Sequence, residues 1–238
     1  MSEAAARLGG MRLFAAVLPP AAAVAELDMA VARLKGLPGA GELRWTGREG
    51  WHFTLAFMGE VEERQLPELS ERLGRAASRT EPFSLRLHGG GHFGDRALWA
   101  GVAGGTDRLG RLADRADAAA RRTGVPMDEH RHYRPHLTLA RVRRAPATDL
   151  RPYLEALSGF EGSAWQVAEL ALVRSNLPVS GVRGDRPRYE TLLRCPLGRA
   201  GTEGHADPRT EARAGSRTEA RAGGRTGNPG SGAAARDR

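Results

Sequence analysis

Two copies of one tetrapeptide carry the residue types that suit acid–base chemistry. The copies are His52-Phe53-Thr54-Leu55 and His136-Leu137-Thr138-Leu139, and each alternates polar and apolar side chains. In a β-strand, residues two apart project from the same face, so each copy offers an imidazole and a hydroxyl on one side and apolar anchors on the other. Two such strands set near each other would bring two histidines and two threonines into one small volume.

This set of side chains suits phosphoester chemistry without a metal. One histidine can act as general base and the other as general acid, because an unperturbed imidazole pKa lies near 6.5. The threonine hydroxyls can donate hydrogen bonds to non-bridging phosphate oxygens. Asp128, His130 and His132 are candidate metal ligands. Their Asp-Glu-His-Arg-His setting is crowded with charge and favours a solvated loop, so we expect no metal.

Length and cysteine content place the chain among ordinary globular proteins. Its 238 residues are enough for one large domain or two small lobes. The sequence holds no apolar run long enough to span a bilayer, and Met1 to Gly10 lack the pattern of a signal peptide. Cys195 is the single cysteine, which excludes an internal disulfide and fits a reducing compartment. We therefore expect a cytoplasmic protein that does not bind membranes.

The charge of the chain is basic, and nearly all of the positive charge is arginine. The formal net charge is +8, and Lys35 is the only lysine. Residues 199–238 hold eight arginines and five acidic residues, which leaves +5 of the +8 on the remaining body. A modestly basic body fits a phosphate-bearing ligand but does not require one.

Hydrophobic periodicity predicts the elements that position the two motifs. Apolar runs and alternation predict strands over residues 12–18, 51–58, 83–87, 98–102, 136–142, 167–174 and 189–193. Apolar residues at helical spacing predict helices over 21–37, 61–77, 106–123 and 150–157. Gly89-Gly90-Gly91 predicts a flexible turn.

The order of these elements indicates two related halves, each with one motif strand. His52 and His136 are 84 residues apart, about the size of a small lobe. We therefore predict an α+β fold of two pseudo-symmetric lobes, each with an antiparallel sheet and helices, with the active-site cleft between the lobes.

Composition divides the chain into three predicted regions. Residues 1–10 are expected to be a flexible N-terminus, and residues 11–197 are expected to form the two-lobed domain. Residues 198–238 are rich in arginine, glycine and alanine and hold no large apolar residue, so they cannot bury enough surface to fold alone. We predict that this tail is disordered.

Several blocks around the motifs resemble one family. Trp51–Glu60 and Arg134–Arg141 are similar to its two histidine motifs with their flanking residues. Further similar blocks are Arg12–Pro19, Gly91–Phe93 with Leu98–Val102, and Leu172–Ser175 with Pro187–Glu190. Over residues 12 to 193 the chain resembles the bacterial and archaeal RNA 2′,3′-cyclic phosphodiesterases. These enzymes, once named 2′-5′ RNA ligases, belong to the two-histidine (2H) phosphoesterase superfamily.

The resemblance implies a reaction and a role for each motif residue. The reaction is hydrolysis of RNA 2′,3′-cyclic phosphate ends to 2′-phosphomonoesters, with slow 2′-5′ joining of RNA ends as its reverse. His52 would donate a proton to the leaving 3′ oxygen, and His136 would accept one from water. Thr54 and Thr138 would hold the non-bridging oxygens. No cofactor is implied.

Further contacts to the substrate are expected from nearby residues. Arg141 would add positive charge at the phosphate, although a regular strand would turn it away from His136. A bulge or the end of the strand must therefore redirect it. Tyr133, Phe93 or Trp51 would stack on a terminal base.

The motifs leave more than one function open. They would serve equally well an enzyme for small nucleotide cyclic phosphates or 2′,5′-linked oligonucleotides. The sequence also fits a non-catalytic RNA-binding protein or a metal-dependent hydrolase. The expected partner is RNA with a 2′,3′-cyclic phosphate end, without an obligate protein partner, and we expect a monomer.

Overall fold

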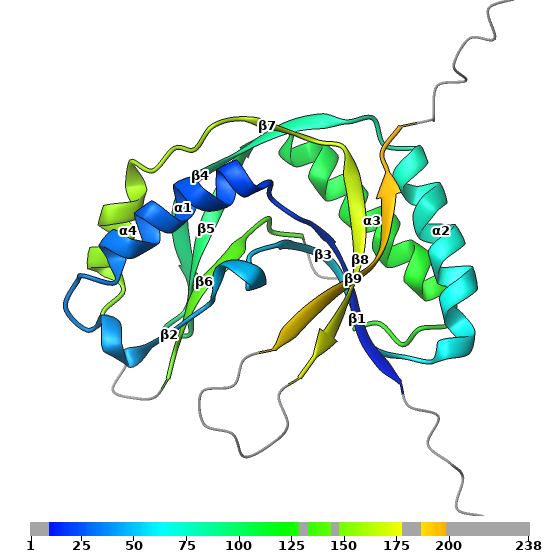
Figure 1. Ribbon diagram of the computed structural model, residues 1–238, viewed down its shortest axis with the longest axis horizontal. Coiled ribbons are helices and arrows are strands. Elements are labelled where there is room, and N and C mark those ends of the chain that lie inside the picture. The colour runs from blue at the N-terminus through cyan, green and yellow to red at the C-terminus, as the bar shows by residue number, and fades with distance from the viewer. Residues whose placement is uncertain (1–9, 129–132, 144–147, 178–186, 199–238) are drawn as a thin grey trace, which may run out of the picture. The chain divides into compact units, whose positions relative to one another are not determined.

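The computed structural model describes residues 10–128, 133–143, 148–177 and 187–198 (Figure 1). Most of the expected flexible N-terminus and disordered tail lies outside the described residues, as do His130 and His132. The described chain forms two antiparallel sheets and four α-helices, which confirms the predicted α+β class. None of its helices has the length and apolar character needed to cross a membrane.

The first sheet, called sheet A, carries the first motif. Its strands lie in the order β3-β1-β8-β9. Their bounds are Phe53–Val61 for β3, Met11–Val17 for β1, Glu169–Asn176 for β8 and Arg188–Pro196 for β9. Helix α3 (Thr106–Arg122) packs against β3, and helix α2 (Leu66–Ser78) packs against β8, β9 and α3.

The second sheet, called sheet B, carries the second motif. Its strands lie in the order β2-β6-β5-β4-β7. Their bounds are Leu43–Trp45 for β2, Leu137–Val142 for β6, Ala97–Gly104 for β5, Phe83–Phe93 for β4 and Trp165–Val167 for β7. Helices α1 (Ala21–Leu34) and α4 (Arg151–Ser158) pack against β4. Figure 1 shows α1 and α4 beside sheet B, and α2 and α3 beside sheet A.

The two sheets repeat one plan, as the pseudo-symmetry predicted. In the units β1-α1-β3 and β5-α3-β6, the motif strand pairs with the strand that precedes the helix. The helix of each unit then packs on the other sheet. Sheet A also takes β8 and β9 from the C-terminal part of the chain. The lobes are therefore interleaved rather than consecutive halves.

Apolar side chains fill the core between sheets and helices. Strand β1 is a continuous buried run from Leu13 to Val17, as expected for a strand covered on both faces. Helix α3 buries the stripe that its 3.6-residue periodicity predicts, with Leu109, Leu112 and Ala116 fully covered.

The boundaries of several elements differ from those predicted. Strand β3 continues past Gly59 to Val61, and the following helix begins only at Leu66, after the 3₁₀ turn η3 (Glu63–Gln65). A capping box between Glu62 and Gln65 caps the turn η3, because the two residues satisfy each other's backbone N–H groups. Helix α1 ends at Leu34 rather than at residue 37.

Short strands account for the remaining differences. The predicted strand 167–174 divides into β7 and β8, which belong to different sheets. Strand β2, which lies between the 3₁₀ turns η1 (Ala40–Glu42) and η2 (Arg48–Gly50), was not predicted. The three glycines predicted to form a turn lie inside β4, where the register with β5 shifts and Gly89 has φ +59°.

Candidate active site

Strand alternation presents the polar residues of both motifs away from the core. In the first motif, which leads into β3, Phe53 and Leu55 are buried, whereas His52 and Thr54 are half-buried. The second motif repeats this pattern, with Leu137 and Leu139 buried and the histidine and threonine of the motif half-buried. Neither threonine hydroxyl has a hydrogen-bond partner within the described part of the chain.

A β-bulge follows the threonine in both motifs. Ala16 pairs with Thr54 but Ala15 pairs with Ala56, so Leu55 is the extra residue in β3. In β6, Leu139 is the extra residue by the same criterion, since Trp99 pairs with Thr138 and Leu98 with Ala140. A bulge bends the strand and breaks its alternation.

The bulge in β6 bears on the direction of Arg141. Without it, Arg141 would face away from His136, five residues earlier. With the extra residue between them, both side chains belong to the same face of sheet B. The electrostatics agree, because the positive charge of Arg141 lowers the pKa of His136.

The ring of His136 is held by its own backbone and by two aromatic residues. Its Nδ1 lies 2.8 Å from the carbonyl oxygen of Arg134, which leaves Nε2 available for a ligand. The Phe93 ring meets the imidazole edge to face at 4.7 Å between centroids, and Trp99 lies at 6.4 Å. Burial lowers the pKa of His136, the Arg134 carbonyl opposes this, and the charges of Arg141 and Arg134 lower it further.

The ring of His52 has an equivalent environment in sheet A. It stacks on Phe14 at 4.6 Å between centroids and meets Tyr189 edge to face at 5.4 Å. Burial is the main cause that lowers the pKa of His52 to about 4, a hydrogen bond with the backbone of Gly50 opposes it, and the charge of His136 lowers it further. The two imidazoles therefore lie within electrostatic reach, and each is hydrogen-bonded to the residue two positions earlier.

The rings of Phe93 and Trp99 form an aromatic pair beside the second histidine, 5.6 Å apart between centroids. The Trp99 indole covers Gly91, where a Cβ atom would lie 2.1 Å from the ring, so only glycine fits there. The Arg134 guanidinium lies over both rings, 4.9 Å from the Trp99 centroid and 5.6 Å from that of Phe93. Cation–π contacts of this kind fix the direction of an arginine next to the site.

The aromatic residues predicted to stack on a base fall into two groups. Phe93 lies beside His136 and is half-buried. Trp51 is only 4% exposed, because alternation points it into the core, opposite to His52. Tyr133 packs against the core with its hydroxyl buried, and this burial raises its pKa. The burial of Trp51 contradicts its expected stacking role, whereas Phe93 and Tyr133 are both half-buried and stay candidates for stacking on a base.

Some residues of the site were not predicted as functional. Phe14 and Tyr189 contact His52, and Trp99 lies beside His136. Tyr189 is far from both motifs in sequence, and it lies next to His52 only because β1, β8 and β9 follow β3 in sheet A. No local pattern in the sequence could have indicated that contact.

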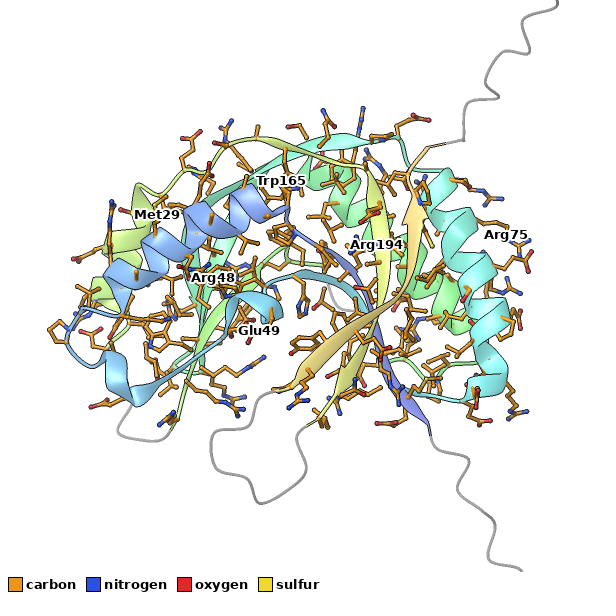
Figure 2. The ribbon with its side chains drawn as sticks, viewed as in Figure 1. Met29, Arg48, Glu49, Arg75, Trp165 and Arg194 are labelled. Atoms are coloured by element: carbon orange, nitrogen blue, oxygen red, sulfur yellow. The ribbon has the colours of Figure 1, made fainter. Side chains whose placement is uncertain are left out.

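A small cavity next to His52 is lined from both sheets. Its volume is about 150 Å³. The lining residues are Arg44, Trp45, Thr46, Gly47, Glu49, Gly50, Arg141, Pro187 and Tyr189. Figure 2 shows Glu49 on the turn η2, in the region between the two sheets. Within the described residues, no group of three or more His, Cys, Asp or Glu side chains could hold a metal ion.

Known proteins are similar to this chain in sequence and in fold. A model of the 2′-5′ RNA ligase superfamily matches residues 19–177. The RNA 2′,3′-cyclic phosphodiesterase of Thermus thermophilus is 33% identical over 209 residues, which cover 82% of this chain and 96% of that protein. The enzyme of the same name from Geobacillus stearothermophilus is 32% identical over 157 residues, but the match covers 64% of this chain and only 47% of that protein.

The solved structures agree with the sequence comparison. E. coli LigT in its apo form is 28% identical and has a TM-score of 0.62, covering 80% of this chain and 99% of LigT. The chain therefore belongs to the 2′-5′ RNA ligase superfamily.

Proposed function

We propose that the protein is an RNA 2′,3′-cyclic phosphodiesterase that opens the cyclic phosphate to a 2′-phosphomonoester. The observation that carries this proposal is the pair His52 and His136, which come from different sheets and interact electrostatically. The relatives of that name, one of them matched over 96% of its length, support the reaction.

Opening of the ring requires one proton transfer on each side of phosphorus. A water molecule attacks phosphorus in line with the bond to the 3′ oxygen, and His136 accepts the proton that the water loses. The P–O3′ bond breaks, and His52 gives its proton to the leaving 3′ oxygen. The product keeps the phosphate on the 2′ oxygen. If an RNA 5′-hydroxyl replaces water, the same displacement forms a 2′-5′ linkage.

The remaining residues stabilise the charge that develops on phosphorus. Thr54 and Thr138 donate hydrogen bonds to the two non-bridging oxygens, one from each sheet. Arg141 supplies positive charge next to His136, where the bulge in β6 directs it. Fixed donors of this kind favour the transition state because they need no reorganisation during the reaction.

The choice of His52 as donor rests on the family resemblance rather than on the pKa values. Burial lowers the pKa of both imidazoles, so both favour the neutral form without a ligand. A bound cyclic phosphate is an anion and raises the pKa of each ring, which supplies the protonated donor.

The reaction is tested with a short RNA that ends in a 2′,3′-cyclic phosphate, incubated in EDTA. The proposal predicts turnover with a 2′-phosphate as the only product. A mixture of 2′- and 3′-phosphates would contradict attack in line with the 3′ oxygen. Binding of the RNA without turnover would favour a non-catalytic role.

A substrate with sulfur in place of the 3′ bridging oxygen tests the assignment of the donor. A thiolate leaves without protonation, so His52→Ala should regain most of its rate on this substrate. His136→Ala should remain inactive, because it still lacks the base. Rescue of His136→Ala instead would reverse the two roles.

A further inference from the structure

Two arginines lie directly opposite each other on neighbouring strands of sheet B. Arg44 in β2 and Arg141 in β6 are register partners, so their side chains stand on the same face. Like charges at directly opposed positions destabilise a sheet. Both residues line the cavity of about 150 Å³, together with Glu49 and Tyr189.

Sheet A contributes a third arginine to the same region. Arg12 in β1 lies over the Phe57 ring at 4.8 Å from its centroid, and Phe57 follows His52 by the same five residues as Arg141 follows His136. The bulge at Leu55 therefore affects Phe57 as the bulge at Leu139 affects Arg141. The charges of Arg141, Arg12 and Arg44 all lower the pKa of Tyr189, although burial raises it overall and Glu49 adds to the rise.

The three arginines lie at different distances from the reaction. Arg141 acts on His136 as well as on Tyr189, so it lies near the reacting phosphate. Arg44 lies one strand further out, and neighbouring strands are about 4.8 Å apart. The described residues that line the cavity include two arginines, Arg44 and Arg141, and one carboxylate, that of Glu49, so two of its three charged side chains are positive.

We propose that Arg44, supported by Arg12, binds the phosphodiester on the 5′ side of the nucleotide whose cyclic phosphate is opened. This inference rests on the proposed function and names its substrate more closely. An RNA end carries that second phosphate, whereas a cyclic mononucleotide lacks it. The subsite therefore selects RNA ends over small nucleotide cyclic phosphates, through a contact that positions the chain and reads no base.

The test compares two substrates, a dinucleotide with a 2′,3′-cyclic phosphate end and a 2′,3′-cyclic mononucleotide. Wild type should show a higher kcat/KM on the dinucleotide. Arg44→Gln should lower that value about tenfold, mainly through KM, and change the mononucleotide value less than about twofold. Arg44→Lys should recover part of the loss. Arg111→Gln on the exposed face of α3 is the matched control and should behave as wild type.

Two further measurements isolate the charge of the internal linkage. A dinucleotide with a neutral methylphosphonate linkage should react like the mononucleotide and should not respond to Arg44→Gln. For the natural dinucleotide, Arg44→Gln should reduce the slope of log(kcat/KM) against log salt by about 0.7, as expected for one lost phosphate contact on a single strand.

The outcomes separate this inference from the proposed function. Equal losses on both substrates would place Arg44 at the reacting phosphate and overturn the inference, as would unchanged values on both. If wild type turns over neither substrate, the proposed function itself fails. A melting temperature for Arg44→Gln that matches wild type confirms that the comparison is made on folded protein.

Discussion

The two histidines are held by the same two kinds of contact, one at each sheet. Each ring is hydrogen-bonded to the backbone two residues earlier, and each lies against an aromatic ring, Phe14 for His52 and Phe93 for His136. Burial keeps both pKa values below that of a free imidazole. Without a ligand both imidazoles therefore favour the neutral form, and a bound anion would favour the protonated form.

The lowered pKa of His52 predicts a dependence of stability on pH. The unfolded chain protonates this group near pH 6.5, but the folded protein does so only near pH 4. Between these values the unfolded state binds more protons, so the free energy of unfolding decreases as pH falls through this window. Denaturant unfolding at pH 7.5 and 4.5 should show a loss from this group of roughly 2–3 kcal/mol.

The variant His52→Gln separates this contribution from other titrating groups. It lacks the imidazole, so its stability should fall less between the two pH values, while the contribution of acidic residues is shared with wild type. Equal losses in wild type and His52→Gln would contradict the lowered pKa.

At the scale of elements, the motif strands were predictable, but the positions of the bulges that direct their side chains were not. Alternation in the sequence is enough to place His52 and Thr54 on one face, and helix α3 follows its apolar stripe. The expected role of Arg141 required a bulge or a strand end, and the structure has a bulge at Leu139. The exact position of this bulge, and the bulge at Leu55, could not be predicted because they depend on the register with β5 and β1. Strands β2 and β7 are too short for a periodic signal.

The glycine in β4 shows how one element shapes the site in another. Gly91→Ala should push the Trp99 indole away, because the new Cβ would overlap the ring. We expect a loss of stability of about 1–3 kcal/mol, and a loss in kcat/KM of at least about tenfold as the Trp99 ring beside His136 shifts. Thermal unfolding and steady-state kinetics measure both effects.

Gly110→Ala is the matched control for this substitution. Gly110 lies within α3 and a Cβ there would meet no atom within 4 Å, so alanine should stabilise the helix by about 0.5–1 kcal/mol. If Gly91→Ala were as stable and active as wild type, the close contact with Trp99 would not matter for the site.

At the scale of the molecule, the site depends on the way in which the two lobes are interleaved along the chain. In the units β1-α1-β3 and β5-α3-β6, the helix packs on the sheet to which its own strands do not belong. Each sheet is therefore covered in part by a helix from the other unit. The order of the predicted elements indicated the pseudo-symmetry. That each helix packs on the other sheet could be recognised only once the pairing of the strands was known. The contact between Tyr189 and His52 could not be predicted from the sequence, because it depends on the order of strands β3-β1-β8-β9 in sheet A.

The folded unit should not require the C-terminal 40 residues. Leu197 is buried, and the N–H of Gly198 donates to the carbonyl of Thr80 at 2.8 Å. These contacts anchor the end of the folded unit. A chain ending at Gly198 should therefore keep its melting temperature within about 2 °C and its activity unchanged. A drop of more than about 5 °C would show that the tail contributes to folding.

The most direct test of the two-histidine mechanism is the rate of cyclic phosphate opening in EDTA by four proteins. These are wild type, His52→Ala, His136→Ala and His88→Ala, an exposed histidine in β4 that serves as the control. We predict that either site variant loses at least about 100-fold in kcat/KM, while His88→Ala matches wild type. Retention of the full rate by either His52→Ala or His136→Ala would contradict the mechanism.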